Sequence, residues 1–478
     1  MSEAAWTHPC YAEVANLVRL RTGLVFGPAR RAFAEAGIRR AMAKAGVPDA
    51  DEYLDRLRAG NLAIDDLIPE LTVAETYLFR DRPHFAFVER EIVPEVLARR
   101  GPDHTLRVWS AGCATGEEAY SLAILFEEMG LGERVFILAT DISLSSLAHA
   151  RAGAYGARSF RDPGHPADRY FRKAGRRFVV SARLGRRVSF EYLNLAMDRY
   201  PSFATNTWGF DLILCRNVLI YFDAATTEAA GRRLAGCLAA GGWLITGPSD
   251  PPLTTDLLEP VVVPEGVFYR RPVRPRCRPG DIALAIDRPF EGGARRADSA
   301  AMPLLSLPPD AADPIFEARA VTARQPRAQT SERPRGGDAD AEAHAREIRR
   351  LADRGDVAAA RATAERAIAI HPLCAELHFL HGVLLMDLRR YREATQSMRR
   401  VVYLEPRSPV PHLVLGAILR RLGNTKDAAR AFETAERLAV SYSREDVVPL
   451  ADGETADRLA EAAVAQLALS RAGDGRNA

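Results

Sequence analysis

The stretch LRVWSAGCATGEEAYSLAILF, residues 106–126, decides the fold we expect for the central part of the chain. Its first four residues are typical of a buried strand, residues 110–116 of a tight turn, and the apolar spacing that follows of a helix. In α/β proteins such a turn presents backbone N–H groups to a ligand. Gly112 has no side chain, so the main chain can approach that ligand closely.

The charges next to this turn indicate a cationic ligand. The turn lacks the glycine spacings of dinucleotide-binding and P-loop motifs. Glu117 and Glu118 stand in the first helical turn, where they favour the helix dipole but would repel a pyrophosphate. S-adenosylmethionine carries a sulfonium and an ammonium group, and we expect it to be the cofactor.

Two further polar residues end predicted strands. Asp141 follows the strand 135–140, about 25 residues after the turn, where a carboxylate accepts hydrogen bonds from ribose hydroxyls. NAD-binding proteins use the same position, so Asp141 alone leaves the cofactor open. Asn217 ends the strand 210–217, and strands alternate with helices through residues 101–272, which predicts a doubly wound, mainly parallel sheet. We therefore expect Gly112, Asp141 and Asn217 to converge at its carboxyl edge.

The rest of the chain divides by pattern and composition. Residues 1–100 show helical periodicity, and short alternating segments at about 165–192 predict a small antiparallel flap. Ten of the 30 prolines lie within residues 272–334, and we predict a flexible linker at residues 273–340. A 34-residue period then relates Gly382 to Gly416 and Pro372 to Pro406, and resembles three tetratricopeptide repeats at 341–440, with a capping helix and tail at 441–478.

Composition excludes several classes of protein. A net charge of +3 gives no reason to expect nucleic acid or direct membrane insertion, and no run of 18 apolar residues occurs. Six scattered cysteines without a paired framework favour a cytoplasmic protein with reduced thiols. Histidines in the repeats are explained by packing, and we expect no metal. Five cations on residues 28–45 are either a solvated face or a docking surface for an acidic partner.

Four segments together identify a family resemblance. SAGCATGEEAYSLA (110–123), ATDIS (139–143), EYLNL (191–195) and above all CRNVLIYFD (215–223) resemble chemoreceptor glutamate methyltransferases of the CheR type. LTVAETYLFRD (71–81) resembles the segment that joins the helical and catalytic domains in that family. The resemblance covers about residues 8–272 and implies cofactor contacts from Thr76, Arg80, Glu117, Asp141, Asn194, Leu195, Asn217 and Val218. Ala74 stands where many members carry Asn.

The implied chemistry needs few groups. A glutamate carboxylate is already ionised at neutral pH, so methyl transfer to its oxygen requires orientation and removal of water but no general base. Arg80 and Tyr221 are the candidate catalytic residues, since both can orient a carboxylate or the cofactor by hydrogen bonds. Tyr221 could equally be a core aromatic residue. Cys113 and Cys215 flank the site and are explained by packing.

The resemblance implies methylation of glutamates on the cytoplasmic helical bundle of a methyl-accepting chemotaxis-type receptor. In similar proteins the flap grips a receptor tail peptide, but the short turn at residues 172–177 with its one glycine leaves that function open. The repeats would then bind a peptide or protein partner and direct the enzyme to its receptor. One alternative is a catalytically weak scaffold that acts through its repeats, and another is a methyltransferase for a small carboxylic acid.

Overall fold

The computed structural model describes residues 6–72, 75–161, 169–273 and 336–474. The N-terminal helices form a small bundle whose core includes the fully buried side chains of Val18, Ile38 and Leu67. Three cations of the basic helix pair within this bundle, Arg39 with Glu35 and both Arg40 and Lys44 with Glu70. These pairs favour the solvated-face interpretation. The helices are α1 (Pro9–Thr22), α2 (Arg31–Ala45), α3 (Ala50–Arg58) and α4 (Ile68–Leu71).

The helical segment that leads into the sheet is not one regular helix. Its ends are α-helical, α5 (Arg82–Phe87) and α6 (Val93–Arg100), but Val88–Ile92 between them is a π-helix. Pro94 has no N–H to donate to the carbonyl four residues earlier. A wider turn before it accommodates that missing bond.

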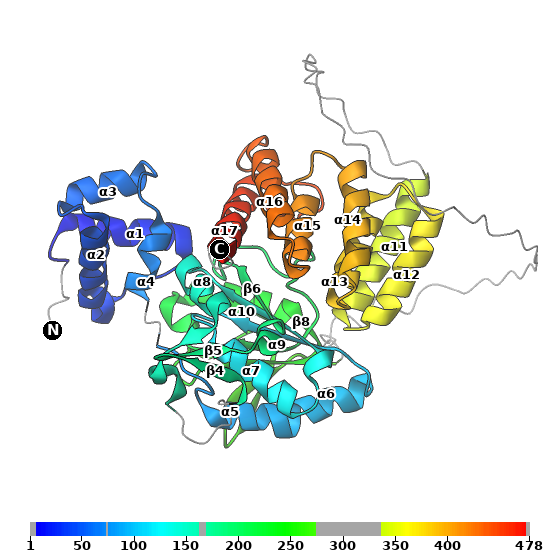
Figure 1. The fold of residues 1–478 in the computed structure, drawn as a ribbon, viewed down its shortest axis with the longest axis horizontal. Coiled ribbons are helices and arrows are strands. Elements are labelled where there is room, and N and C mark those ends of the chain that lie inside the picture. The colour runs from blue at the N-terminus through cyan, green and yellow to red at the C-terminus, as the bar shows by residue number, and fades with distance from the viewer. Residues whose placement is uncertain (1–5, 73–74, 162–168, 274–335, 475–478) are drawn as a thin grey trace, which may run out of the picture. The chain divides into compact units, whose positions relative to one another are not determined.

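A seven-stranded sheet with the order β6–β2–β1–β7–β8–β10–β9 forms the centre of the catalytic region (Figure 1). The first five strands run parallel, and β10 and β9 close one edge antiparallel. This confirms the doubly wound sheet. The strands are β1 (Leu106–Ala111), β2 (Val135–Asp141), β6 (Val188–Tyr192), β7 (Phe210–Cys215), β8 (Leu238–Thr246), β9 (Glu259–Val263) and β10 (Gly266–Arg270). The helices of the crossovers include α7 (Glu117–Glu128), α8 (Leu144–Ala152) and α10 (Ala224–Cys237).

The predicted flap is smaller than expected. Its separate sheet has the order β3 (Ala154–Tyr155), β5 (Arg177–Val180) and β4 (Phe171–Ala174). Placing residues 187–190 in it was wrong, because β6 pairs in parallel with β2 at the edge of the main sheet. A short alternating segment shows that one face is covered but does not say which sheet it joins.

The C-terminal region consists of three helical hairpins and a last helix. The turns between paired helices contain Gly355, Arg389 and Gly423, all with φ between 58° and 80°, so the 34-residue period marks the same left-handed position each time. Added Cβ atoms at Gly382 and Gly416 would strike the side chains of Met398 and Phe432. These features are consistent with a tetratricopeptide-like solenoid. The helices are α11 (Gly336–Asp353), α12 (Val357–Ile370), α13 (Ala375–Asp387), α14 (Tyr391–Leu404), α15 (Val410–Arg421), α16 (Thr425–Val440) and α17 (Ala456–Asp474).

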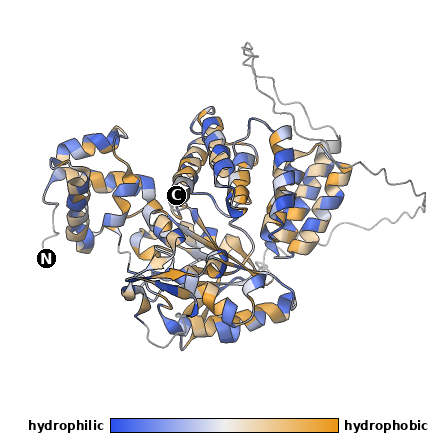
Figure 2. Ribbon diagram, viewed as in Figure 1, coloured by the Kyte–Doolittle hydropathy of each residue, from blue (hydrophilic) through white to orange (hydrophobic). Residues whose placement is uncertain are grey.

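Most of the expected linker, residues 274–335, lies outside the described residues. Figure 2 shows polar and apolar residues side by side around many of the helices, the pattern of elements with one buried and one exposed face. Within the described ranges, no helix combines the length and the apolar character needed to cross a membrane.

Candidate functional site

The turn after β1 is bent over the end of β2. The backbone N–H groups of Gly112 and Cys113 both donate to the carbonyl oxygen of Thr140, at 2.8 and 2.9 Å. Gly112 has a φ of 80°, and a Cβ there would strike Val218, so both the backbone and the packing require glycine. Ala114 also has a positive φ, of 46°. The small residues of the motif are thus explained by a strained turn that packs tightly.

A cavity opens beside this turn, at the carboxyl ends of β1, β2 and β7. The space within it, together with the open solvent at its mouth, amounts to about 710 Å³. Seven of the residues expected at the site line it: Gly112, Asp141, Asn194, Leu195, Asn217, Val218 and Tyr221. The N-terminal bundle adds four lining residues that the sequence did not suggest: Thr22, Leu24, Ile68 and Thr72. Bundle and sheet therefore build this cavity together.

Asp141 lies at the end of β2 with its carboxylate held by the backbone. One carboxylate oxygen accepts the N–H of Ala114 and the other the N–H of Ser143, each at 2.8 Å. Burial raises the pKa of Asp141, whereas these backbone donors lower it. A carboxylate has about four acceptor positions, so acceptor capacity remains for a ligand hydroxyl. The donor set fits the ribose of a nucleoside cofactor.

Asn194 organises the chain after β6. Its side-chain oxygen accepts the N–H groups of Ala196 and Met197, at 3.0 and 3.2 Å, and its amide nitrogen donates to the carbonyl of Arg21 at 3.0 Å. Its side-chain acceptor is therefore occupied by the protein, and one amide N–H remains for a ligand. Leu195 follows with only 6% of its surface exposed and lines the cavity.

Asn217 is held in the left-handed region at φ 59° by a carboxylate that the sequence reasoning missed. Asp250 accepts the N–H of Asn217 at 2.5 Å and those of Gly247 and Ile220 at 2.8 and 3.2 Å. Burial raises the pKa of Asp250, and these three donors oppose that effect. An acidic residue four positions after strand β8 was the available signal for this role.

Tyr221 belongs both to the cavity and to a core. Its ring lies in the apolar cluster of the N-terminal bundle, 9% exposed, and the guanidinium of Arg30 stacks 4.5 Å above it. Arg30 also donates to the carbonyl of Ile220 at 3.3 Å. Both interpretations of Tyr221 therefore have support, since it packs as a core residue and faces the cavity.

The remaining expected residues do not line the cavity. Arg80 donates to the carbonyl of Glu75 at 2.7 Å, and Thr76 is half-buried in the same segment. Glu117 is buried beneath the turn, where its carboxylate accepts the hydroxyls of Thr115 and Ser159, at 2.7 and 2.8 Å. Ala74, the departure from the family pattern, lies outside the described residues.

Arg216 anchors the segment that carries Arg80, and the sequence reasoning passed over it although it stands inside the CRN motif. Its guanidinium is 2% exposed, contacts Glu118 at 3.0 Å and pairs with Asp81. It also donates to the carbonyl of Arg80 at 2.6 Å. Glu118 in turn accepts the hydroxyl of Ser110. This network ties the segment to β1 and α7.

The cysteines of the site are packing residues. Cys113 and Cys215 are buried, and burial raises the pKa of both thiols well above the usual value. Raised thiol pKa values oppose a nucleophilic role. Among the described residues, no group of three or more His, Cys, Asp and Glu side chains is arranged to hold a metal ion.

Comparisons with known proteins match the two regions of the chain that line this cavity. A family model for the all-alpha domain of CheR methyltransferases matches residues 11–72, and one for their S-adenosylmethionine-binding domain matches residues 74–259. These matches confirm S-adenosylmethionine as the cofactor.

Two curated relatives illustrate the range of the similarity. The chain is 30% identical, over 88% of its length and 97% of the relative, to the probable biofilm formation methyltransferase WspC of Pseudomonas aeruginosa. It is 32% identical to chemotaxis protein methyltransferase 1 of the same organism, over 52% of its length and 92% of the relative.

Proposed function

Because the chain belongs to the CheR methyltransferase family, we propose that it methylates glutamate side chains of a methyl-accepting, chemotaxis-type receptor. Its activity as an S-adenosylmethionine-dependent methyltransferase in a chemosensory pathway follows from the family. The receptor and the glutamate carboxylate are our proposal. The observation that carries the proposal of methyl transfer is that Gly112, Asp141 and Asn217, at the ends of three strands, line one cavity.

Two lining residues account for binding of the cofactor. Asp141 accepts the ribose hydroxyls, and Gly112 lets the backbone approach the ligand. Glu118 does not line the cavity and its charge is offset by Arg216, so the acidic residue that faces the cofactor is Asp141. When bound, S-adenosylmethionine supplies a methyl group on a sulfonium sulfur; a carboxylate oxygen bonds to that carbon as the sulfur–carbon bond breaks and the electron pair stays on sulfur.

The chain needs to supply no proton acceptor for this reaction. A carboxylate and a sulfonium combine to give a neutral ester and a neutral thioether, so opposite charges disappear in the transition state. Water stabilises the charged reactants more than the partly neutralised transition state. Removing water therefore lowers the activation barrier. The apolar side chains of Leu24, Ile68 and Leu195 around the cavity provide that exclusion of water.

Two observations support a macromolecular substrate. The N-terminal bundle lines the same cavity as the sheet, so a protein bound to the bundle lies next to the site of transfer. The C-terminal hairpins are consistent with a tetratricopeptide-like solenoid, and we propose that they bind a peptide or protein partner. The similarity to the biofilm-formation relative extends through this region, which supports a chemosensory pathway with an output other than swimming.

Transfer of a tritiated methyl group to co-expressed receptor cytoplasmic fragments tests the proposal. We expect label that mild base releases from the wild-type reaction. The family resemblance, rather than the cavity lining, assigns Arg80 a charged hydrogen bond to the cofactor or the carboxylate, so Arg80→Ala should lose about tenfold or more of the label. Arg90→Ala is the control, because Arg90 pairs with Glu265 on the surface. Tight cofactor binding without label on any receptor would support the scaffold alternative instead. Equal labelling by Arg80→Ala would remove Arg80 from the site.

A further inference from the structure

The cofactor loop, defined here as residues 193–199, follows β6 and supplies three residues to the cavity, Leu193, Asn194 and Leu195. We infer that the C-terminal helix α17 positions this loop, with Arg458 acting through Asp198 on Asn194, so that the repeats set the affinity for the cofactor. The inference rests on the cavity being the S-adenosylmethionine site.

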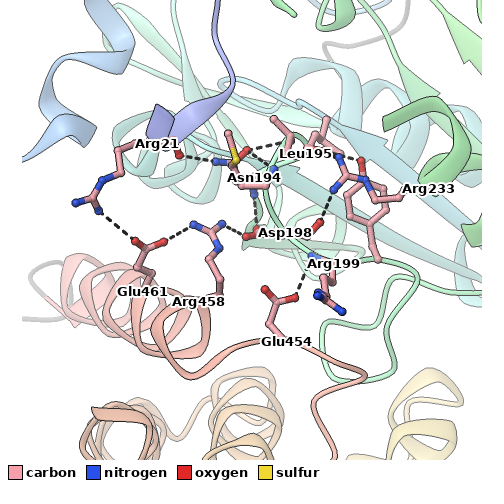
Figure 3. A network of polar contacts seen from close by, with 12 residues as sticks. Arg21, Asn194, Leu195, Asp198, Arg199, Arg233, Glu454, Arg458 and Glu461 are labelled. Atoms are coloured by element: carbon pink, nitrogen blue, oxygen red, sulfur yellow. Dashed lines mark hydrogen bonds and ion pairs between the residues drawn. The ribbon is translucent and has the colours of Figure 1, made fainter. Parts of the chain in front are cut away.

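A closed circuit of polar contacts joins α17 to Asn194 (Figure 3). Arg458 pairs with one carboxylate oxygen of Asp198, whose other oxygen accepts the backbone N–H of Asn194 at 2.6 Å. Arg458 also pairs with Glu461, which lies 3.6 Å from the guanidinium of Arg21. The carbonyl of Arg21 accepts the side-chain amide of Asn194. Asn194 is therefore held from two sides, and both routes pass through α17.

These contacts are shielded from water. The side chains of Arg458 and Asp198 are 19% and 17% exposed, so their attraction is screened less than that of a surface pair. The contact of Glu461 with Arg21 is weaker, because the Arg21 side chain is 59% exposed. Arg458 and Asp198 thus form the stronger of the two routes.

The turn before α17 holds the other end of the loop. Glu454 accepts the backbone N–H of Arg199 at 3.0 Å (Figure 3). Asp452 accepts the backbone N–H of Phe203 at 2.9 Å and the hydroxyl of Ser202 at 3.1 Å. These carboxylates of the C-terminal region accept two backbone N–H groups and one hydroxyl of the catalytic domain. The loop geometry therefore depends on residues more than 250 positions away in the chain.

The catalytic domain also supports the loop with side chains of its own, and the hydroxyl of Tyr200 donates to the carbonyl of Leu195 at 2.8 Å. Arg233 on α10 donates to the carbonyls of Leu195, Ala196 and Asp198, at 2.9, 3.0 and 3.0 Å (Figure 3). Arg233 therefore binds the loop from the side of the sheet while Arg458 binds it from α17. Loss of Arg458 is expected to loosen the loop without releasing it.

The repeats are held on the catalytic domain by buried charges. Glu191, two positions before the loop, contacts Arg420 of α15 at 2.7 Å and lies near Arg421 and Arg151. Arg107 of β1 pairs with Asp387 of α13 at 2.5 Å, both at most 3% exposed. Buried ion pairs contribute little net stability but are costly to separate, so they specify one docking geometry. A partner that shifts the repeats at this interface would displace the residues of α17 that hold the cofactor loop.

The inference predicts a defined change in affinity. We expect Arg458→Ala to weaken binding of S-adenosylhomocysteine by the full-length protein about tenfold, within the usual range for coupled sites. Methyl transfer at saturating S-adenosylmethionine should change less than about twofold, because Arg458 touches no reacting atom. Arg458→Lys keeps the charge and should restore most of the affinity. Arg444→Ala is the matched control, since Arg444 is an exposed cation whose ion pair, within the described part of the chain, is with Asp457 of α17.

Isothermal titration calorimetry with S-adenosylhomocysteine measures these affinities. In an Asp198→Asn background, Arg458→Ala should add little, because the pair has already been weakened. By reciprocity, the ligand should slow amide hydrogen exchange in α17 of the wild-type protein, a readout that remains if Arg458→Ala fails to fold. Wild-type affinity in Arg458→Ala, or no ligand effect on α17, would overturn the inference and leave the proposed function standing. A wild-type protein that binds no S-adenosylhomocysteine would instead refute the cavity assignment.

Discussion

Replacing Asp141 by Asn tests the cavity at its most constrained carboxylate. Both oxygens accept a backbone N–H, from Ala114 and Ser143, and both face further donors when a ribose is present. Asn has one oxygen and one NH₂ group, so either orientation sets an amide donor against a backbone donor. The variant therefore loses one bond within the turn and one acceptor for a ribose hydroxyl.

Each lost bond to a charged acceptor costs about 1.5–3 kcal/mol. For the ribose hydroxyl this weakens binding of S-adenosylhomocysteine roughly 10- to 150-fold. For the turn, the lost bond lowers the free energy of unfolding by about 1.5–3 kcal/mol. Calorimetric titration and urea unfolding measure the two effects separately.

Asp49→Asn is the matched control for this experiment. The Asp49 carboxylate caps α3 by accepting the N–H of Glu52 at 2.8 Å, and Asn caps a helix about as well as Asp. We expect the control to bind and unfold like the wild type. An Asp141→Asn variant with wild-type affinity would refute the assignment of Asp141 to the ribose.

Three further perturbations test the packing and the charges. Gly416→Ala should lower the free energy of unfolding by about 1–3 kcal/mol in urea, because its Cβ strikes a neighbouring ring, whereas Gly27→Ala, with open space around it, should not. Arg216→Met removes the cation that pairs with two carboxylates and should lower the free energy of unfolding by about 3–5 kcal/mol, measured as a lower melting temperature. Burial opposes ionisation of Glu191, but Arg420 and its neighbours outweigh it and hold the pKa of Glu191 at about 2. Ionised Glu191 therefore stabilises the fold fully above the usual pKa of 4.5, and this stability is lost as the pH falls toward 2. Glu191→Gln should make the urea concentration at the unfolding midpoint depend less on pH over that range.

Local sequence signals predicted the centre of the site well. Gly112, Asp141 and Asn217 follow strands of a parallel sheet, and the carboxyl ends of such strands meet at one edge. Predicting their convergence therefore required only the order of strands and helices along the chain. The 34-residue period was equally readable, because each inter-helix turn needs the same left-handed residue, even where Arg389 occupies it.

Features made by distant segments could not be predicted in this way. Asp250 was missed because its three backbone partners become neighbours only when β7 and β8 pair. The strand 188–192 was assigned to the wrong sheet, since its alternation is satisfied by either. The contact of Arg458 with Asp198 joins residues 260 positions apart, and no local pattern marks either as a partner.

The central claim is that this protein esterifies receptor glutamates. Mapping the methylated positions of a receptor cytoplasmic fragment by mass spectrometry, after incubation with the wild-type protein and S-adenosylmethionine, tests it directly. We predict methyl groups on glutamate side chains, removed by mild base and absent where those glutamates are replaced by glutamine. Base-stable methyl groups on lysine, cysteine or another side chain would contradict the claim.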